Sequence, residues 1–162
     1  MSNNHIISVL VENKAGVLAK VSGLFSRRGF NIESLAVGTT DDPEISRITL
    51  VVNAESHSIE QVVKQLYKLI NILKIQELDP DNIVERELVL IKIKTDNNTR
   101  AEILEIADIF RANIVDVGKK SLVIEITGSS KKVSGLEELL KPYGIQELIR
   151  TGKIAITRGS KK

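Results

Sequence analysis

The chain has 162 residues, of which 42% are hydrophobic and 27% are charged, a composition typical of a soluble globular protein. Its 23 Lys and Arg nearly balance its 21 Asp and Glu, so bulk charge does not favour binding to nucleic acid or to a membrane surface. It has no cysteine, which excludes disulfides, thiolate metal sites and cysteine nucleophiles.

The first half of the chain predicts the order β-α-β-β-α-β. Short β-branched runs indicate strands, and apolar residues spaced three and four apart indicate helices. The first helix is expected to end at Gly29, which follows two arginines, because cations and then glycine are favoured at a helix C-terminus. The elements are expected at residues 6–11 (strand), 17–28 (helix), 31–40 and 45–53 (strands), 59–73 (helix) and 75–78 (strand).

The second half repeats this order beyond a turn-rich segment, Asp-Pro-Asp-Asn, at 79–82. Its elements are expected at residues 87–93 (strand), 103–110 (helix), 113–117 and 121–127 (strands), 132–140 (helix) and 144–159 (terminal strand material). Shifting the sequence by 82 residues superposes Asn31-Ile32 on Asn113-Ile114 without a gap, which indicates two copies of one unit.

The fold class expected from this repeat is α+β, with two consecutive ferredoxin-like βαββαβ domains. The predicted boundaries are 1–78 for the N-terminal domain, 79–84 for a linker and 85–162 for the C-terminal domain. Each domain has only about 80 residues and an open sheet face, so association with a second copy is expected to add stability.

The connection between the first strand and the first helix reads Asn-Lys-Ala-Gly, from Asn13 to Gly16. In the shifted copy these two positions are Thr95 and Asn98, so a glycine opens only the first helix. The first helical turn carries unpaired N–H groups and the positive end of the dipole, and glycine lets an anion approach them. A small carboxylate, such as that of an amino acid, fits this site, with Asn13 and Asn31 as hydrogen-bonding partners. Turn and capping chemistry alone is the alternative explanation.

Patterns for catalysis are missing from the sequence. It has no Walker loop, GxGxxG or GxSxG, and its two histidines, His5 and His57, lack a nucleophile or ligand set nearby in the sequence. An RNA-binding module can share this fold order, but it needs stacking aromatic residues on its strands. The chain has three Phe, two Tyr and no Trp, so a non-catalytic binding or regulatory module is favoured.

The stretch VENKAGVLAKVSGLFSRRGFNIESLAVG, residues 11–38, resembles the N-terminal ACT domain of the small, regulatory subunit of acetohydroxyacid synthase, also called acetolactate synthase. The resemblance extends along residues 6–159 and includes DPDNIVERELVLIKI and the ending RTGKIAITRG. It implies a homodimer formed through ACT domains, with feedback inhibitor, usually valine, bound at their interface.

The effector-binding residues that this resemblance implies come from two chains. One chain contributes the β–α turn and its neighbour the start of the next strand. Proline is common in the family at the position of Ala15, so a softer loop and weaker binding are expected here. The implied residues are Asn13, Ala15, Gly16, Val17 and Leu18, with Asn31 and Ile32 from the neighbour.

The resemblance also implies a partner, the catalytic large subunit, which uses thiamine diphosphate, a divalent metal such as Mg and commonly FAD. This chain would carry none of these cofactors. It would activate the large subunit and confer valine sensitivity in branched-chain amino-acid biosynthesis. A stand-alone ACT-domain sensor that regulates another protein is the alternative. The expected location is the cytoplasm, or a plastid in a photosynthetic eukaryote, because no secretion signal or bilayer-spanning apolar run is present.

Overall fold

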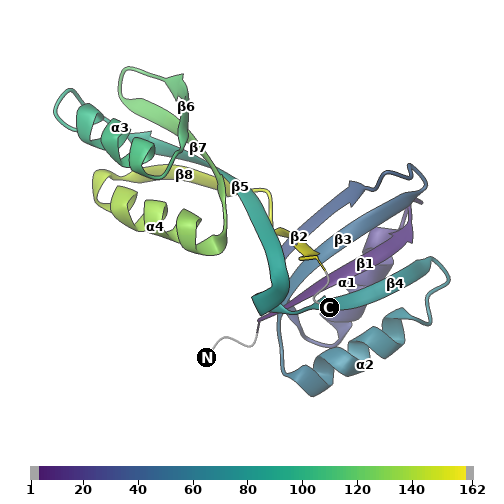
Figure 1. The fold of residues 1–162 in the computed structure, drawn as a ribbon. Helices are drawn as coiled ribbons and strands as arrows, with labels where there is room; N and C mark the ends of the chain where they lie inside the picture. Colours follow the sequence, from purple (N-terminus) through teal and green to yellow (C-terminus); the bar gives the residue numbers. More distant parts are fainter. Residues whose placement is uncertain (1–3, 160–162) are drawn as a thin grey trace. The chain divides into compact units, whose positions relative to one another are not determined.

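The computed structural model describes residues 4–159, except the side chains of residues 56 and 57. The chain divides into two compact units (Figure 1). The first holds the described residues up to Val84 together with those from Lys153 onward, and the second holds Glu85–Gly152. This division differs from the expected one, which assigned everything from 85 to 162 to the second domain.

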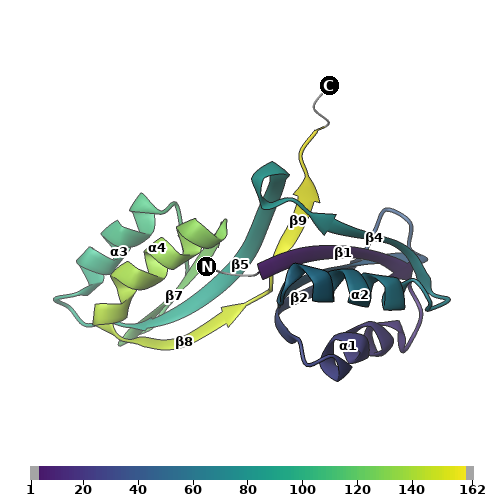
Figure 2. The ribbon, with the colours of Figure 1, turned by 90° about the horizontal axis from the view of Figure 1, so that it is seen from below.

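The first unit has a four-stranded antiparallel sheet in the order β2-β3-β1-β4. Helices α1 and α2 pack against each other across one face of this sheet (Figure 2). The order is that of the expected ferredoxin-like βαββαβ unit. Its elements are β1 (Asn4–Glu12), α1 (Val17–Arg27), β2 (Asn31–Thr39), β3 (Ile45–Asn53), α2 (Ser56–Leu66) and β4 (Ile72–Leu78).

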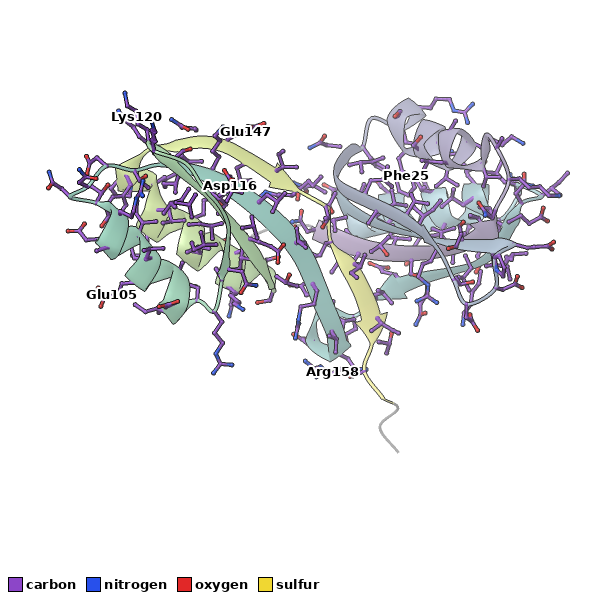
Figure 3. The ribbon with its side chains drawn as sticks, turned by 90° about the horizontal axis from the view of Figure 1, so that it is seen from above. Phe25, Glu105, Asp116, Lys120, Glu147 and Arg158 are labelled. Carbon is purple, nitrogen blue, oxygen red and sulfur yellow. The ribbon has the colours of Figure 1, made fainter. Side chains whose placement is uncertain are left out.

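The core of the first unit lies between the sheet and its two helices. Alternate residues of β1, Ile7 and Val9, face the helices because side chains of a strand point to opposite sides in turn. Helix α1 contributes Val17, Val21 and Phe25, spaced at one helical face. Phe25, labelled in Figure 3, is completely buried. Burying a side chain of this size contributes about 1.5–3 kcal/mol, so this core fixes the start of α1 against the sheet.

Helix α2 is shorter than its apolar spacing predicted. It ends at Leu66, and Ile70, expected on the helix face, is 91% exposed. The hydroxyl of Tyr67 accepts from the N–H of Ile75 and donates to its C=O, at 3.1 and 3.2 Å. The Tyr67 side chain therefore satisfies the N–H and C=O of Ile75 on the edge strand β4. This strand begins at Ile72 and not at residue 75 as predicted.

The second unit repeats the same architecture, with a sheet in the order β6-β7-β5-β8 and two helices packed on it. The predicted α+β class with two ferredoxin-like units is therefore confirmed. Strand β5 begins within the expected linker, after the short turn η1 (Pro80–Asn82). Its elements are β5 (Ile83–Lys94), α3 (Arg100–Ile109), β6 (Asn113–Val117), β7 (Ser121–Gly128), α4 (Ser130–Leu140), η2 (Lys141–Tyr143) and β8 (Ile145–Arg150).

The last strand, β9 (Ile154–Thr157), belongs to the first unit, although it follows β8 directly in sequence. Its Ala155 is buried with Ile6, Val51, Leu78 and Ile83. Ile6 pairs with both Val51 and Leu78 and alternates with Ile7, so this cluster covers the sheet face opposite the helices. The separate burial of this small cluster explains why the C-terminal residues group with the first unit.

Within the described residues, no helix is long and apolar enough to cross a membrane.

Candidate functional site

The turn between β1 and α1 is built around Gly16. Its φ of 85° lies in the left-handed region, which glycine adopts without a Cβ penalty. Gly16 is the N-cap of α1, and its C=O accepts from the N–H of Lys20 at 3.1 Å. No side chain caps this helix, so the N-terminal N–H groups of α1 must find their hydrogen-bond acceptors in the backbone, in solvent or in a ligand.

Four backbone N–H groups at this turn have no acceptor within residues 4–159: those of Ala15, Gly16, Leu18 and Ala19. The N–H of Val17 reaches the C=O of Lys14 at 3.4 Å. A Cβ built on Gly16 would meet nothing within 4 Å. The positive end of the α1 dipole is therefore open to an anion at the position predicted from the sequence.

Asn13 does not cap α1; it holds the turn between β2 and β3 instead. Its side-chain Nδ2 donates to the C=O of Pro43 at 2.9 Å, and its backbone N–H donates to the C=O of Glu44 at 2.7 Å. No donor to its Oδ1 is found among the described residues. The amide is thus oriented by Pro43, and its oxygen is left for a ligand.

Beside Asn13 lies an open hollow of about 490 Å³ with an acidic lining. The ammonium of Lys14 pairs with the Glu12 carboxylate at 2.8 Å, which lowers the pKa of Glu12 and raises the pKa of Lys14. The Nδ2 of Asn71 also donates to Glu12, at 3.3 Å. The lining contains three carboxylates and one ammonium. It consists of Glu12, Asn13, Lys14, Asp42, Pro43, Glu44 and Ile45.

The other predicted residues divide into core and surface. Val17 is buried in the first core and Ile32 packs against it, so only their backbone groups can face a ligand. The side chain of Leu18 is 39% exposed, next to its own unpaired N–H, and offers an apolar contact. Asn31 is exposed at the start of β2, paired with Asn53.

Asn31 lies at the opposite end of α1 from Gly16. The helix has 11 residues, so at about 1.5 Å per residue its two ends are about 16 Å apart. One chain therefore does not bring Asn13 and Asn31 to one small ligand. Their joint participation needs a second copy, which is the arrangement the resemblance implies.

The second unit provides an internal comparison, because its equivalent turn is closed. The Asp96 carboxylate accepts from the N–H groups of Asn98 and Thr99, both at 2.8 Å, and these bonds lower the pKa of Asp96. The guanidinium of Arg100 donates to the C=O of Gly118 and of Lys119. A carboxylate of the chain itself thus binds the turn that leads into α3, including the N–H of Asn98 at the position equivalent to Gly16, whereas the N–H of Gly16 has no acceptor among the described residues.

Sequence reasoning missed two contributors to the site. The N–H of Ala19 is unpaired like that of Leu18, and helix spacing alone could have included it, because up to four N–H groups are free in a first turn. The second contributor is the loop that holds Pro43 and Glu44, between β2 and β3. Its contact with Asn13 depends on the pairing of β1 with β3, a long-range contact that local sequence patterns do not reveal.

No group of three His, Asp or Glu suited to a metal ion is found within the described residues. The ring of His5 contacts the carboxylate of Glu77 and the C=O of Ala54, which ties β1 to its neighbours. The side chain of His57 lies outside the described part of the structure.

Comparison with known proteins gives matches for both units. Residues 7–74 match the family described as the AHAS small subunit-like ACT domain, and residues 86–159 match the family described as the small subunit of acetolactate synthase. The chain is 53% identical to the acetolactate synthase small subunit of Mycolicibacterium smegmatis, over 98% of this chain and 95% of that protein.

A probable acetolactate synthase small subunit of Archaeoglobus fulgidus is 55% identical, with 98% of this chain and 99% of that protein covered. Among solved structures, the acetolactate synthase small subunit of Thermotoga maritima is similar with a TM-score of 0.90 and 42% identity. That match covers 98% of this chain and 99% of the other.

Proposed function

The chain belongs to the acetolactate synthase small-subunit family, and from that premise we propose that it senses valine and passes this signal to the catalytic large subunit. One observation carries the choice of site. The four unpaired N–H groups at the start of α1 face an open surface, whereas in the second unit the N–H of Asn98, equivalent to that of Gly16, is already bound by the Asp96 carboxylate. The first unit is therefore the one that accepts a carboxylate from outside.

A second copy completes the site through β2. This strand is at the edge of the sheet, so its outer backbone groups are available for pairing. Two β2 strands related by a two-fold axis run antiparallel, which brings the partner's Asn31 to the Thr39 end of β2. Thr39 pairs with Ser46, next to the turn that Asn13 holds. A homodimer formed in this way places the β–α turn of one chain beside Asn31 and Ile32 of the other.

The charges favour a zwitterion over a simple anion. The unpaired N–H groups suit one carboxylate, while the hollow beside Asn13 is lined by Glu12, Asp42 and Glu44. A phosphate with two charges would be repelled by these side chains, whereas an α-ammonium would be attracted. The exposed part of Leu18 then contacts an aliphatic side chain. These features together select a small aliphatic amino acid.

The chain itself binds and signals, and the chemistry belongs to its partner. We place thiamine diphosphate, the divalent metal and FAD on the large subunit, as the family resemblance implies. Valine bound between two ACT domains changes their mutual orientation, and the large subunit responds by losing activity. Linkage then requires valine to bind the activating and non-activating states with different affinities.

The direct test is calorimetry of the purified chain with valine, leucine and isoleucine, followed by assay of the holoenzyme reconstituted with its large subunit. We expect saturable binding of valine and a matching loss of acetolactate formation. A chain that binds none of the three amino acids, yet still activates the large subunit, would contradict the effector part of the proposal and leave the family assignment intact.

A further inference from the structure

The C-terminal segment Lys153–Arg158, here called the return segment, is anchored to the first unit at three points. The N–H of Lys153 donates to the hydroxyl Oγ of Ser34 at 2.7 Å. Ala155 is buried against the outer face of the sheet, and the N–H of Arg158 donates to the C=O of Asn82 at 2.9 Å. Figure 3 labels Arg158 at the end of this segment. The first of these anchors lies on the edge strand of the proposed effector site.

Ser34 occupies a special position in β2. The pairing of β2 with β3 shifts register between Ile32 and Ser34, so a bulge separates the predicted effector residues from the serine. A bulge is a point where a strand can bend and redirect a side chain. The half-buried hydroxyl of Ser34 therefore depends on how the first residues of β2 are held.

The other end of the connection is short. Thr151 is fixed within the second unit, where its N–H donates to the C=O of Leu88 at 3.0 Å and its hydroxyl accepts from the N–H of Leu88 at 3.1 Å. Only Gly152, with a φ of 90°, stands between Thr151 and Lys153. Lys153 is thus the first residue of the first unit after the chain leaves β8.

We propose that Ser34 is a positioning residue that transmits effector occupancy from the start of β2 to the return segment. This inference rests on the proposed function. An effector bound at Asn31 and Ile32 fixes the first residues of β2. It thereby holds the Ser34 hydroxyl in place and strengthens the hydrogen bond that this hydroxyl accepts from the Lys153 N–H. The unliganded chain lets this bond open more often, and the difference between the two states is the signal.

Residue-resolved amide exchange of the full chain, with valine as the probe, tests this directly. Saturating valine is expected to slow exchange of the Lys153 N–H about fivefold, the effect of one strengthened hydrogen bond, while Arg158 N–H stays unchanged. Ser34→Ala is expected to remove this response. Ser34→Thr keeps the hydroxyl and is expected to restore it.

Inhibition of the holoenzyme by valine distinguishes signal transmission by Ser34 from a purely structural role of this residue. Ser34→Ala should bind valine about fivefold more weakly than wild type, because by linkage the bond that valine strengthens favours valine binding by the same factor, yet it should lose inhibition even at saturating valine. Valine binding with unchanged Lys153 exchange, or full inhibition of the Ser34→Ala holoenzyme, would overturn the inference alone. Absence of valine binding by the wild-type chain would overturn the proposed function together with it.

Discussion

Replacing Gly16 by aspartate would install a carboxylate where the effector carboxylate is proposed to bind. The second unit shows that a carboxylate can bind such a turn, because Asp96, at the position equivalent to Lys14, accepts from two backbone N–H groups of its own turn. At Gly16 the φ of 85° costs a side chain roughly 1–2 kcal/mol, and a negative charge at the helix start returns about 0.5 kcal/mol. The chain is thus expected to lose about 1 kcal/mol of unfolding free energy and to remain folded.

Effector affinity should fall much further than stability. A carboxylate that loses two charge-assisted hydrogen bonds, each worth about 1.5–3 kcal/mol, binds at least a hundredfold more weakly. Calorimetry with valine measures this loss, and urea unfolding measures the stability. Gly144→Ala is the matched control, because Gly144 also has a positive φ, of 100°, but lies in the second unit. It should lose comparable stability and keep valine binding.

The placement of the effector carboxylate at Gly16 is refuted if Gly16→Asp binds valine as wild type does. It is equally refuted if Gly144→Ala loses binding to the same extent, because the loss would then report general destabilisation. Gly16→Ala separates bulk from charge. Its Cβ meets nothing in the chain, so a loss of binding smaller than that of Gly16→Asp is expected.

Two further outcomes test the packing around the site and its closed counterpart. The backbone N–H groups of Thr99 and Asn98 hold the pKa of Asp96 below its usual 3.8, so the stability that Asp96 contributes is fully present only well above that value and is lost as the pH falls through the lowered pKa. The difference in unfolding free energy between wild type and Asp96→Asn should therefore become smaller as the pH is lowered. A difference that grows toward low pH would contradict the assignment. Tyr67→Phe should cost about 1 kcal/mol and speed amide exchange at Ile75, where the hydroxyl bonds both backbone groups, and unchanged exchange would show that the bond is not formed in solution.

The order of elements could be predicted from the sequence because burial patterns are local. Alternation along β1 and the apolar stripe of α1 follow directly from their residues, and Gly29, expected at the C-terminus of α1, adopts the positive φ typical of that position. The prediction of α2 was too long because apolar spacing does not stop at Leu66. The end of the helix there is set by turns of the i→i−3 type and by the Tyr67 contact, which depend on β4.

The long-range features were beyond sequence reasoning. Asn13 was predicted as a cap or a ligand partner, and its bond to Pro43 requires knowing that β1 lies beside β3. The contact of the last residues with the first unit was hidden from the sequence for a similar reason. Ala155 reads as ordinary strand material, and only its burial against Ile6 and Val51 shows that it returns to the first unit.

The most direct test of the central claim, that each site is shared by two chains, is a mixed dimer of Gly16→Asp and Asn31→Ala chains purified through two different tags. Each variant alone should bind no valine. In the mixed dimer one site combines both changes, while the other combines the intact turn of one chain with the intact Asn31 of its partner. Calorimetry should therefore recover one valine per mixed dimer at wild-type affinity. A mixed dimer that binds none would contradict the shared site and place Gly16 and Asn31 in separate roles.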